Sequence, residues 1–257
     1  MMLFNTVTTA LDSDKLEKIG RTIYNNFYGP LGLMMADGKL AGWLYYAIAA
    51  AMVLSGYFLG SMNFAVIISK LKFHEDIRTK GSGNAGATNM SRTYGKVAGV
   101  ATLVGDILKT VLPVLLARFL VGDMFGYLTG LTCALGHAFP CYYKFKGGKC
   151  VAVTAAVLLV MEPLAFLFLL LIFAAVVLGT KYVSLASIFT ALISPVIVHN
   201  FVTGRNFGES HFGLVFLIAQ CLLVIVLHKE NIKRLLNGKE NKFTFKKKKT
   251  ENIGEEK

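Results

Sequence analysis

Apolar residues fill most of the chain between Trp43 and Leu227, and short polar segments interrupt them at intervals. A helix crosses the hydrocarbon core of a bilayer with about 20 apolar residues, or slightly fewer where protein shields it. The pattern therefore predicts an all-α, polytopic integral membrane protein. We expect seven transmembrane spans, at about residues 43–68, 97–121, 124–143, 150–161, 164–179, 182–202 and 212–228.

The number of spans depends on Glu162-Pro163, which interrupts an apolar stretch that would otherwise form one helix and leave six spans. The linkers 70–96 and 144–149 and the chain after residue 228 are rich in Lys and Arg, whereas the other loops hold few. Cytoplasmic loops carry the excess of basic residues. Only a turn at Glu162-Pro163 puts all the basic segments on one side, so we expect seven spans, an outside N-terminus and a cytoplasmic C-terminus.

The same pattern divides the chain into three regions. Residues 1–42 form an extracytoplasmic extension, in which apolar residues at helical spacing behind Ser13 predict an interfacial helix. Residues 43–230 form the seven-helix membrane domain that carries the candidate chemistry. Residues 231–257 form a basic cytoplasmic tail, and its run from Lys246 to Lys249 is expected to contact anionic membrane lipid.

Composition changes how one glycine-rich stretch is interpreted. Hydrophobic residues make up 54% of the 257 residues and charged residues only 16%, and the mean hydropathy is +0.57. Gly81, Gly83 and Gly86 have the spacing of the dinucleotide fingerprint, and the stretch also fits the P-loop spacing except that Ala87 replaces the lysine. Both motifs require a strand before the loop in a soluble α/β unit. We therefore reject both nucleotide-binding folds.

The cysteines and histidines do not predict a metal site. The four cysteines lie in or beside apolar segments without a C-x-x-C pair, and the five histidines lack paired carboxylates. We interpret the cysteines as packing thiols. We expect no metal, no cofactor and no nucleic-acid partner.

The first cytoplasmic linker holds the glycine-rich loop over residues 80–89. Glycines let successive backbone N–H groups approach an anion, and the next helix, expected to begin near Gly95, would point its positive end toward it. A polar turn between two helices is the alternative. We expect this loop to bind a phosphate through Gly81, Ser82, Gly83, Asn84, Gly86, Thr88, Asn89 and Arg92.

The second cytoplasmic linker ends in Gly147-Gly148-Lys149, which combines two glycines with a positive charge at the membrane boundary. We expect these three residues to contact the substrate. His137 lies inside the third span, before Pro140. A histidine within a membrane is a candidate for function, although it could equally satisfy a helix carbonyl.

The remaining candidates lie on later spans. Ser184 and Ser187 share a helical face near the start of the sixth span, and a bond from such a hydroxyl to its own backbone is the favoured alternative to a function. His228 and Asn231 are three residues apart, so they share a helix face where the last span leaves the membrane. Asp106 and Lys109 lie within the second span and are expected to neutralise each other, because an unpaired charge there costs about 2.5–3.5 kcal/mol.

Together these segments predict a basic, donor-rich pocket at the bilayer surface. Such a pocket fits a substrate that holds a phosphate in water and an apolar tail in lipid. A transporter for an organic phosphate is one alternative, but no internal repeat is visible and the polar residues gather at one face. A lipid-sensing scaffold is the other, although it would leave the two glycine loops without a role.

Five blocks of the sequence, in order, resemble those of the PlsY family: "YFLGSMNFAVIISK", "DIRTKGSGNAGATNMSRTYGK", "LGHAFPCYYKFKGGK", "KYVSLASI" and "HKENIKRLLNGKE". The resemblance covers about residues 50–245. These proteins are bacterial acyl-phosphate:glycerol-3-phosphate acyltransferases of the cytoplasmic membrane, with seven spans. Cys150 departs from the family pattern, where a glycine commonly follows the G-G-K, and Ala85 stands where proline is common.

The resemblance implies that the chain moves an acyl group from acyl phosphate to the 1-hydroxyl of glycerol 3-phosphate, giving lysophosphatidic acid. An acyl phosphate is already activated, so no protein nucleophile is needed. His228 or the substrate phosphate would take the hydroxyl proton, and Glu240 would maintain the structure. We expect a monomer whose site faces the cytoplasm. By similarity, the active-site positions are Ser82, Thr88, Arg92, Lys149, Ser187, His228 and Asn231, and Gly81, Gly83 and Gly86 form the phosphate loop.

Overall fold

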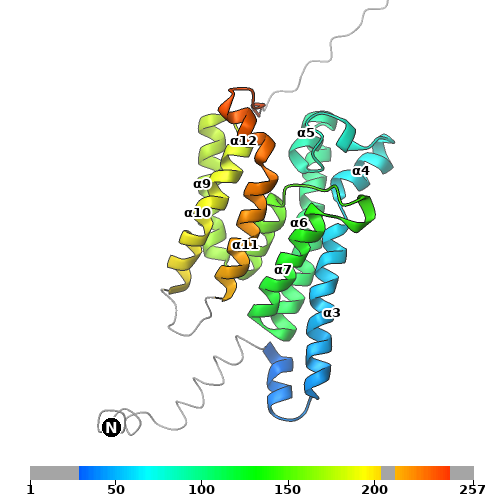
Figure 1. The fold of residues 1–257 in the computed structure, drawn as a ribbon, viewed down its shortest axis with the longest axis vertical. Coiled ribbons are helices and arrows are strands. Elements are labelled where there is room, and N and C mark those ends of the chain that lie inside the picture. The colour runs from blue at the N-terminus through cyan, green and yellow to red at the C-terminus, as the bar shows by residue number, and fades with distance from the viewer. Residues whose placement is uncertain (1–28, 204–211, 244–257) are drawn as a thin grey trace, which may run out of the picture.

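The computed structural model describes residues 29–203 and 212–243, and these residues form helices and no strand (Figure 1). A short helix over residues 29–36 comes first. The expected interfacial helix behind Ser13 lies outside the described residues. The other helices are α3 (Gly42–Ser61), α4 (Phe64–Phe73), α5 (Ala87–Tyr94), α6 (Lys96–Val121), α7 (Asp123–Ala138), α8 (Val151–Met161), α9 (Pro163–Thr180), α10 (Val183–Thr203), α11 (Phe212–Leu227) and α12 (Lys229–Leu236), with 3-10 turns η1 (Ile77–Thr79) and η2 (Cys141–Tyr143).

The all-α class is confirmed, and each of the seven predicted segments contains a helix. Within the described residues, four helical segments have the length and composition to cross a membrane: Gly42–Phe73, Lys96–Val121, Pro163–Thr180 and Val183–Phe201. The pair of helices α11 and α12, bent by 54°, makes a fifth if it counts as one span. Helices α7 and α8 are shorter, with 16 and 11 residues.

Two predicted spans end differently in the structure. The first is broken after Ser61, because the side chain of Asn63 accepts a hydrogen bond from the Val66 N–H and caps the new helix α4. The third ends at Ala138 and not at residue 143, since Pro140 cannot continue a helix. The break at Glu162 is as predicted, with Pro163 at the start of α9.

Helices α3 and α7 pack closely along their glycines. A Cβ atom at Gly60 would overlap the backbone of Cys133, and one at Gly136 would overlap the carbonyl oxygen of Tyr57. Gly56 similarly faces the backbone of Thr129. The four-residue spacing of Gly56 and Gly60 therefore serves close helix packing.

The outer surface of the bundle is largely apolar. Leu112 and Phe119 on α6 are 58% and 67% exposed, and Leu171 on α9 is 70% exposed. Apolar surface of this extent needs a covering partner, which a bilayer provides. Helices α4, α5 and α12 gather at one end of the bundle, and the helix over residues 29–36 lies at the other (Figure 1).

Candidate functional site

A cavity of about 670 Å³ opens among α5, α6, α8, α9, α10 and the junction of α11 with α12. It brings together most of the predicted site residues. Of these, Gly81, Gly83, Gly147 and Gly148 do not line it. Those that do are Ser82, Asn84, Gly86, Thr88, Asn89, Arg92, His137, Lys149, Ser187, His228 and Asn231.

The glycine loop is shaped from beneath by Asn89. The Asn89 side chain accepts a hydrogen bond from the Ser82 N–H at 2.9 Å and donates to the carbonyls of Lys80 and Asn84, each at 3.0 Å. Gly81 has φ 57°, and a Cβ atom there would overlap the Asn89 amide. Asn89 is 1% exposed. Its amide therefore holds the loop, a role that its residue type alone did not reveal.

The helix that follows the loop begins earlier than expected. It is α5, with Gly86 as its N-cap and no side chain capping its first turn. A helix does begin near Gly95, because Gly95 (φ 92°) separates α5 from α6, but α5 and not α6 is the helix that follows the loop. The positive end of α5 thus lies directly at the loop. Thr88 and Arg92 are four residues apart on α5, and both line the cavity.

The second glycine loop is tied to the end of α7. The Gly147 N–H donates to the Ala138 carbonyl at 3.1 Å, and the Gly148 N–H donates to the His137 carbonyl at 3.0 Å. A Cβ atom at Gly148 would overlap Nε2 of His137. We expected both glycines to offer backbone N–H groups to the substrate, but α7 uses those groups. The close packing of these glycines instead places Lys149 at the cavity.

Arg78 joins the two loops. Its Nη1 donates to the carbonyls of Tyr143 at 2.8 Å and Lys146 at 3.1 Å, while Nη2 pairs with Asp76 at 2.7 Å. The hydrogen bond from Arg78 holds the pKa of the Asp76 carboxyl below its usual value, and it outweighs burial, which raises that pKa. The arginine that flanks the glycine loop is therefore engaged in structure, whereas Arg92 is exposed toward the cavity.

Lys149 belongs to a polar cluster that α10 and α12 complete. Its Nζ donates to Oδ1 of Asn231, and the Asn231 Nδ2 donates to Glu240 Oε1 at 2.9 Å. Glu240 also accepts from the Ser184 hydroxyl at 3.0 Å and from Arg234 Nε at 2.8 Å. Ser184 and Arg234 also line the cavity, although we did not select them from the sequence. Arg234 belongs to the charged block after the last span, and Ser184 lies one turn before Ser187 on α10.

The electrostatics of this cluster lower the pKa of its lysine. Burial, and then the positive charge of Arg234, lower the pKa of Lys149 to about 8. Burial raises the pKa of Glu240, but the bonds from Arg234, Asn231 and Ser184 outweigh it and keep that pKa below the usual value. The cluster therefore contains a fixed carboxylate and an ammonium that titrates in the mildly alkaline range.

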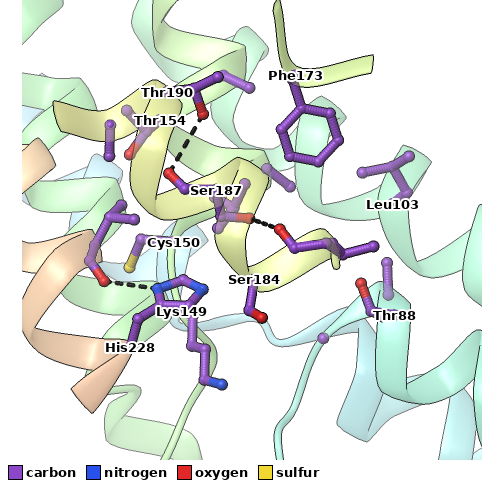
Figure 2. Close-up of a pocket in the computed structure, with 18 of the residues that line it drawn as sticks. Thr88, Leu103, Lys149, Cys150, Thr154, Phe173, Ser184, Ser187, Thr190 and His228 are labelled. Carbon is purple, nitrogen blue, oxygen red and sulfur yellow. Dashed lines mark hydrogen bonds between the residues drawn. The ribbon is translucent and has the colours of Figure 1, made fainter. Parts of the chain in front are cut away.

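His228 lies at the junction of α11 and α12 and is 3% exposed. Its Nδ1 lies 2.7 Å from the carbonyl oxygen of Val224. Since a carbonyl only accepts, Nδ1 carries the proton, and neutral His228 keeps a free electron pair on Nε2. That nitrogen faces the interior of the cavity (Figure 2). The Ser187 hydroxyl donates to the Val183 carbonyl of its own helix at 2.9 Å, so the favoured alternative to a function, a bond to the backbone, is confirmed.

His137 lies in the last turn of α7 and is 4% exposed. Its Nδ1 lies 2.8 Å from Nζ of Lys109, which in turn lies 2.8 Å from Oδ1 of Asp106. The predicted pairing of Asp106 with Lys109 is thus confirmed. His137 also contacts this pair, which the sequence did not predict.

The rest of the cavity is lined mainly by apolar side chains of α6, α8, α9 and α10, the last of which contributes Val183 and Ala191. Sequence reasoning missed these residues, because an apolar side chain that faces the cavity has the same helical spacing as one that faces lipid. Hydroxyls of Thr154, Thr190 and Ser194 are scattered among them. The apolar lining includes Leu103, Ile107, Val151, Ala155, Leu158, Leu159, Phe166, Leu169, Leu170, Phe173, Ala174, Val177 and Leu178 (Figure 2).

Across residues 29–203 and 212–243, no group of three His, Cys, Asp or Glu side chains could hold a metal ion. The cavity combines hydrogen-bond donors, three cations, two carboxylates and two histidines with a lining of apolar side chains.

Comparison with known proteins adds homology to this geometry. The sequence model described as glycerol-3-phosphate acyltransferase matches residues 50–238. The glycerol-3-phosphate acyltransferase of Macrococcus caseolyticus is 41% identical over 199 residues, which cover 77% of this chain and 98% of that protein. That of Syntrophotalea carbinolica is 43% identical over 195 residues, covering 75% and 96%.

Solved structures agree with the sequence comparison. A crystal structure of PlsY, an integral membrane glycerol 3-phosphate acyltransferase, in its glycerol 3-phosphate form is 38% identical, with a TM-score of 0.68 over 76% of this chain and 96% of that one. Its lysophosphatidic acid form is 36% identical, with a TM-score of 0.65 over 76% and 95%.

Proposed function

The chain belongs to the PlsY family of glycerol-3-phosphate acyltransferases, and on that premise we propose that it transfers a fatty acyl chain from acyl phosphate to the 1-hydroxyl of glycerol 3-phosphate. The product is lysophosphatidic acid. Glycerol 3-phosphate as the acceptor is supported by the names of the relatives and by the two forms in which PlsY was solved. Acyl phosphate as the donor is what the resemblance to the PlsY family implies, and the chemistry of the site is compatible with it.

The observation that carries the proposal is the two-part cavity. One end holds Lys149, Arg92 and the start of α5, and the other continues into apolar side chains of α8, α9 and α10. This arrangement accommodates a phosphate and an alkyl chain in one molecule. Burial of the chain contributes about 0.8 kcal/mol per CH₂ group. Lysophosphatidic acid and acyl phosphate both have this shape.

The donor-rich end supplies the charge stabilisation that acyl transfer needs. The hydroxyl of glycerol 3-phosphate attacks the carbonyl carbon of the acyl phosphate, the new ester bond forms, and inorganic phosphate leaves with the electron pair of the broken C–O bond. Negative charge develops on the carbonyl oxygen and on the departing phosphate. Lys149, Arg92 and the start of α5, which share this end of the cavity, would stabilise this charge.

The proton of the attacking hydroxyl goes to Nε2 of His228 in this proposal. That nitrogen faces the cavity with a free electron pair, because Nδ1 donates to Val224. Asn231 orients Lys149 from the same side. The substrate phosphate is the second candidate for the base, since the activated donor lowers the demand on it. Glycerol 3-phosphate would bind through the residues 81–92 loop and helix start.

We further propose seven spans in the bacterial cytoplasmic membrane, with the N-terminus outside and the site facing the cytoplasm. The end of the bundle that carries α4, α5 and α12 also carries the basic linkers, in accord with the positive-inside rule (Figure 1). Reporter tags near Gly122, Glu162 and Gly208 should be extracytoplasmic, and tags near residues 75, 146 and 257 cytoplasmic. A cytoplasmic tag at Glu162 would contradict seven spans.

We also propose that the basic tail contacts anionic lipid and that the protein acts as a monomer.

The deciding experiment uses purified full-length protein in detergent or nanodiscs. Acyl phosphate and glycerol 3-phosphate should together give lysophosphatidic acid and inorganic phosphate, and acyl-CoA should be a poor donor because no site for its nucleotide half is evident in the described cavity. Activity should survive EDTA. Comparable turnover with acyl-CoA would disprove the donor assignment. A protein that moves glycerol 3-phosphate across vesicles without acylating it would be a transporter.

A further inference from the structure

The ammonium of Lys109 makes three close polar contacts inside the bundle. Its Nζ lies 2.8 Å from Oδ1 of Asp106, 2.8 Å from the carbonyl oxygen of Met62 and 2.8 Å from Nδ1 of His137. The Met62 carbonyl is available because α3 ends there. The side chains of Lys109 and Asp106 are 2% and 3% exposed. A protonated lysine has three N–H donors, so each has one acceptor here.

These contacts fix the tautomer of His137. The Lys109 ammonium has only protons to offer, so Nδ1 of His137 must accept with its electron pair. The proton of the neutral ring is then on Nε2. This nitrogen lies against the backbone of Gly148, where an added Cβ atom would overlap it, and the His137 side chain lines the cavity. Within the described residues, Nε2 of His137 makes no hydrogen bond.

We propose that Asp106 and Lys109 are positioning residues that hold His137 as the Nε2–H tautomer, so that this N–H donates a hydrogen bond to an anionic oxygen of the acyl donor beside Lys149. The inference rests on the proposed function for the identity of the ligand. It assigns the buried ion pair a role in catalysis, where the sequence alone predicted only mutual neutralisation.

The location of the donor favours this role. Gly148 donates its own N–H to the carbonyl of His137, so the imidazole and the loop that presents Lys149 are held in one unit. A neutral N–H donor beside a lysine adds to the stabilisation of developing negative charge. Removing one such donor from an enzyme typically lowers kcat by about 10²–10³-fold.

A purely structural role for the ion pair would have a different consequence. Replacing a buried ion pair by apolar residues of similar volume often leaves stability unchanged or improves it, whereas removal of one partner leaves a costly buried charge. The double variant Asp106→Leu with Lys109→Met therefore removes both charges together. If the pair only stabilised the bundle, this folded variant would remain active.

The first test reads the tautomer directly in the full-length protein. Nitrogen-15 spectra of histidine-labelled protein in nanodiscs distinguish Nε2–H from Nδ1–H rings, and the His137→Gln spectrum assigns the His137 signals. Wild-type His137 should be the Nε2–H tautomer, and the double variant should lose that preference. An Nδ1–H ring at His137 in the wild-type protein would overturn the inference. This readout does not depend on activity.

The second test separates the two ring nitrogens by substitution. The amide nitrogen of Gln can reach the place of Nε2, whereas the shorter Asn places its amide near Nδ1. His137→Gln should retain kcat within about tenfold, while His137→Asn and the double variant should lose about 10²-fold with a smaller change in KM. Thr102→Val is the matched control, because Thr102 is buried on α6 and its hydroxyl donates to the Ala98 carbonyl of the same helix.

The outcomes distinguish this inference from the proposed function. If wild-type protein acylates glycerol 3-phosphate and His137→Asn is as active, the inference fails and the function stands. If wild-type protein shows no acyl transfer, the function fails, and the assignment of the acyl donor as ligand fails with it, whatever tautomer the spectra report.

Discussion

Two histidines face the same cavity from the C-terminal ends of different helices, His137 in the last turn of α7 and His228 after the last turn of α11. His228 donates its Nδ1–H to a carbonyl of its own helix, which leaves Nε2 as an acceptor. His137 accepts at Nδ1 from Lys109, which leaves Nε2 as a donor. The same residue type is therefore prepared for opposite tasks.

The difference between the two tautomers shows which tautomer a helix end favours when no other element contacts the histidine. The last carbonyls of a helix lack partners within that helix, and a histidine one turn later satisfies one of them through Nδ1–H. This local contact leaves a potential base on Nε2. Reversing the tautomer requires a donor from another element, here a lysine on α6 that is itself neutralised by Asp106. The Nε2–H tautomer of His137 therefore depends on a buried ion pair.

The largest effect should come from removing the candidate base at His228. His228→Gln replaces a base with an amide that cannot take a proton, so kcat should fall by about 10²–10⁴-fold. The corresponding His137→Gln change should be mild, since an amide can still donate. Steady-state kinetics with acyl phosphate compares the two variants directly. A mild effect at both positions would assign the base to the substrate phosphate.

Alkaline pH should produce the next largest effect, through the lysine that connects the two histidines. On one side, Lys149 follows Gly148, which packs against His137. On the other side, Lys149 donates to Asn231 on α12, the helix that begins after His228. Its pKa, lowered to about 8 mainly by burial, means that the ammonium is protonated below that pH and neutral above it. Activity that needs the charge should therefore be full below pH 8 and decline as the pH rises through it.

The measurement is a pH profile of kcat/KM, which should fall about tenfold per pH unit above the pKa. Lys149→Arg provides the matched control, because an arginine remains charged throughout this range. Its profile should lose the alkaline decline even if its maximum is lower. An unchanged decline in Lys149→Arg would place the titrating group elsewhere.

A smaller and different effect is expected at the glycine loop, which serves neither histidine. Gly86→Ala adds a Cβ atom 2.9 Å from the flexible Asn84 side chain, at an extended φ of −156°. It should raise KM for glycerol 3-phosphate more than it lowers kcat, because contact with the phosphate is made before the transition state. Ala87→Lys should not create ATP binding. Unchanged KM with a collapsed kcat would assign the loop to the departing phosphate.

The sequence predicted the helical segments well, because long apolar runs and the Glu162-Pro163 break are local signals. It also predicted the pairing of Asp106 with Lys109 from their spacing. It did not predict that His137 joins this pair, since their contact depends on how α6 and α7 pack. The same limit applies to Asn89, which was expected to bind the phosphate and whose amide instead holds the loop.

The functional glycines illustrate a second limit. A glycine in a polar segment is compatible with backbone contact to a ligand and with close packing against protein, and residue type does not separate the two. The structure uses Gly148 for packing against His137. Similarly, Glu240 stood out only through resemblance, because its three partners lie on α10 and α12.

The smallest effect is expected at Cys150, next to Lys149 in the chain. Cys150 has φ 63°, a left-handed conformation that costs a residue with a side chain about 1–2 kcal/mol. Its buried thiol donates to the Ala134 carbonyl at 3.1 Å, which offsets part of that strain. Cys150→Gly removes both, so the free energy of unfolding should change by less than about 1 kcal/mol, as measured by thermal unfolding in detergent.

The contrasting variant is Cys150→Val, because a β-branched side chain is strongly disfavoured at positive φ. It should lower the unfolding midpoint clearly, whereas Cys150→Gly should keep kcat within about threefold of the wild-type value. That result is expected because the bonds from Gly147 and Gly148 to α7, and not the thiol, hold the loop at His137. If Cys150→Gly lowered kcat as far as His137→Asn does, the thiol would be the element that positions Lys149, and the ion pair beneath His137 would lose its part in the comparison.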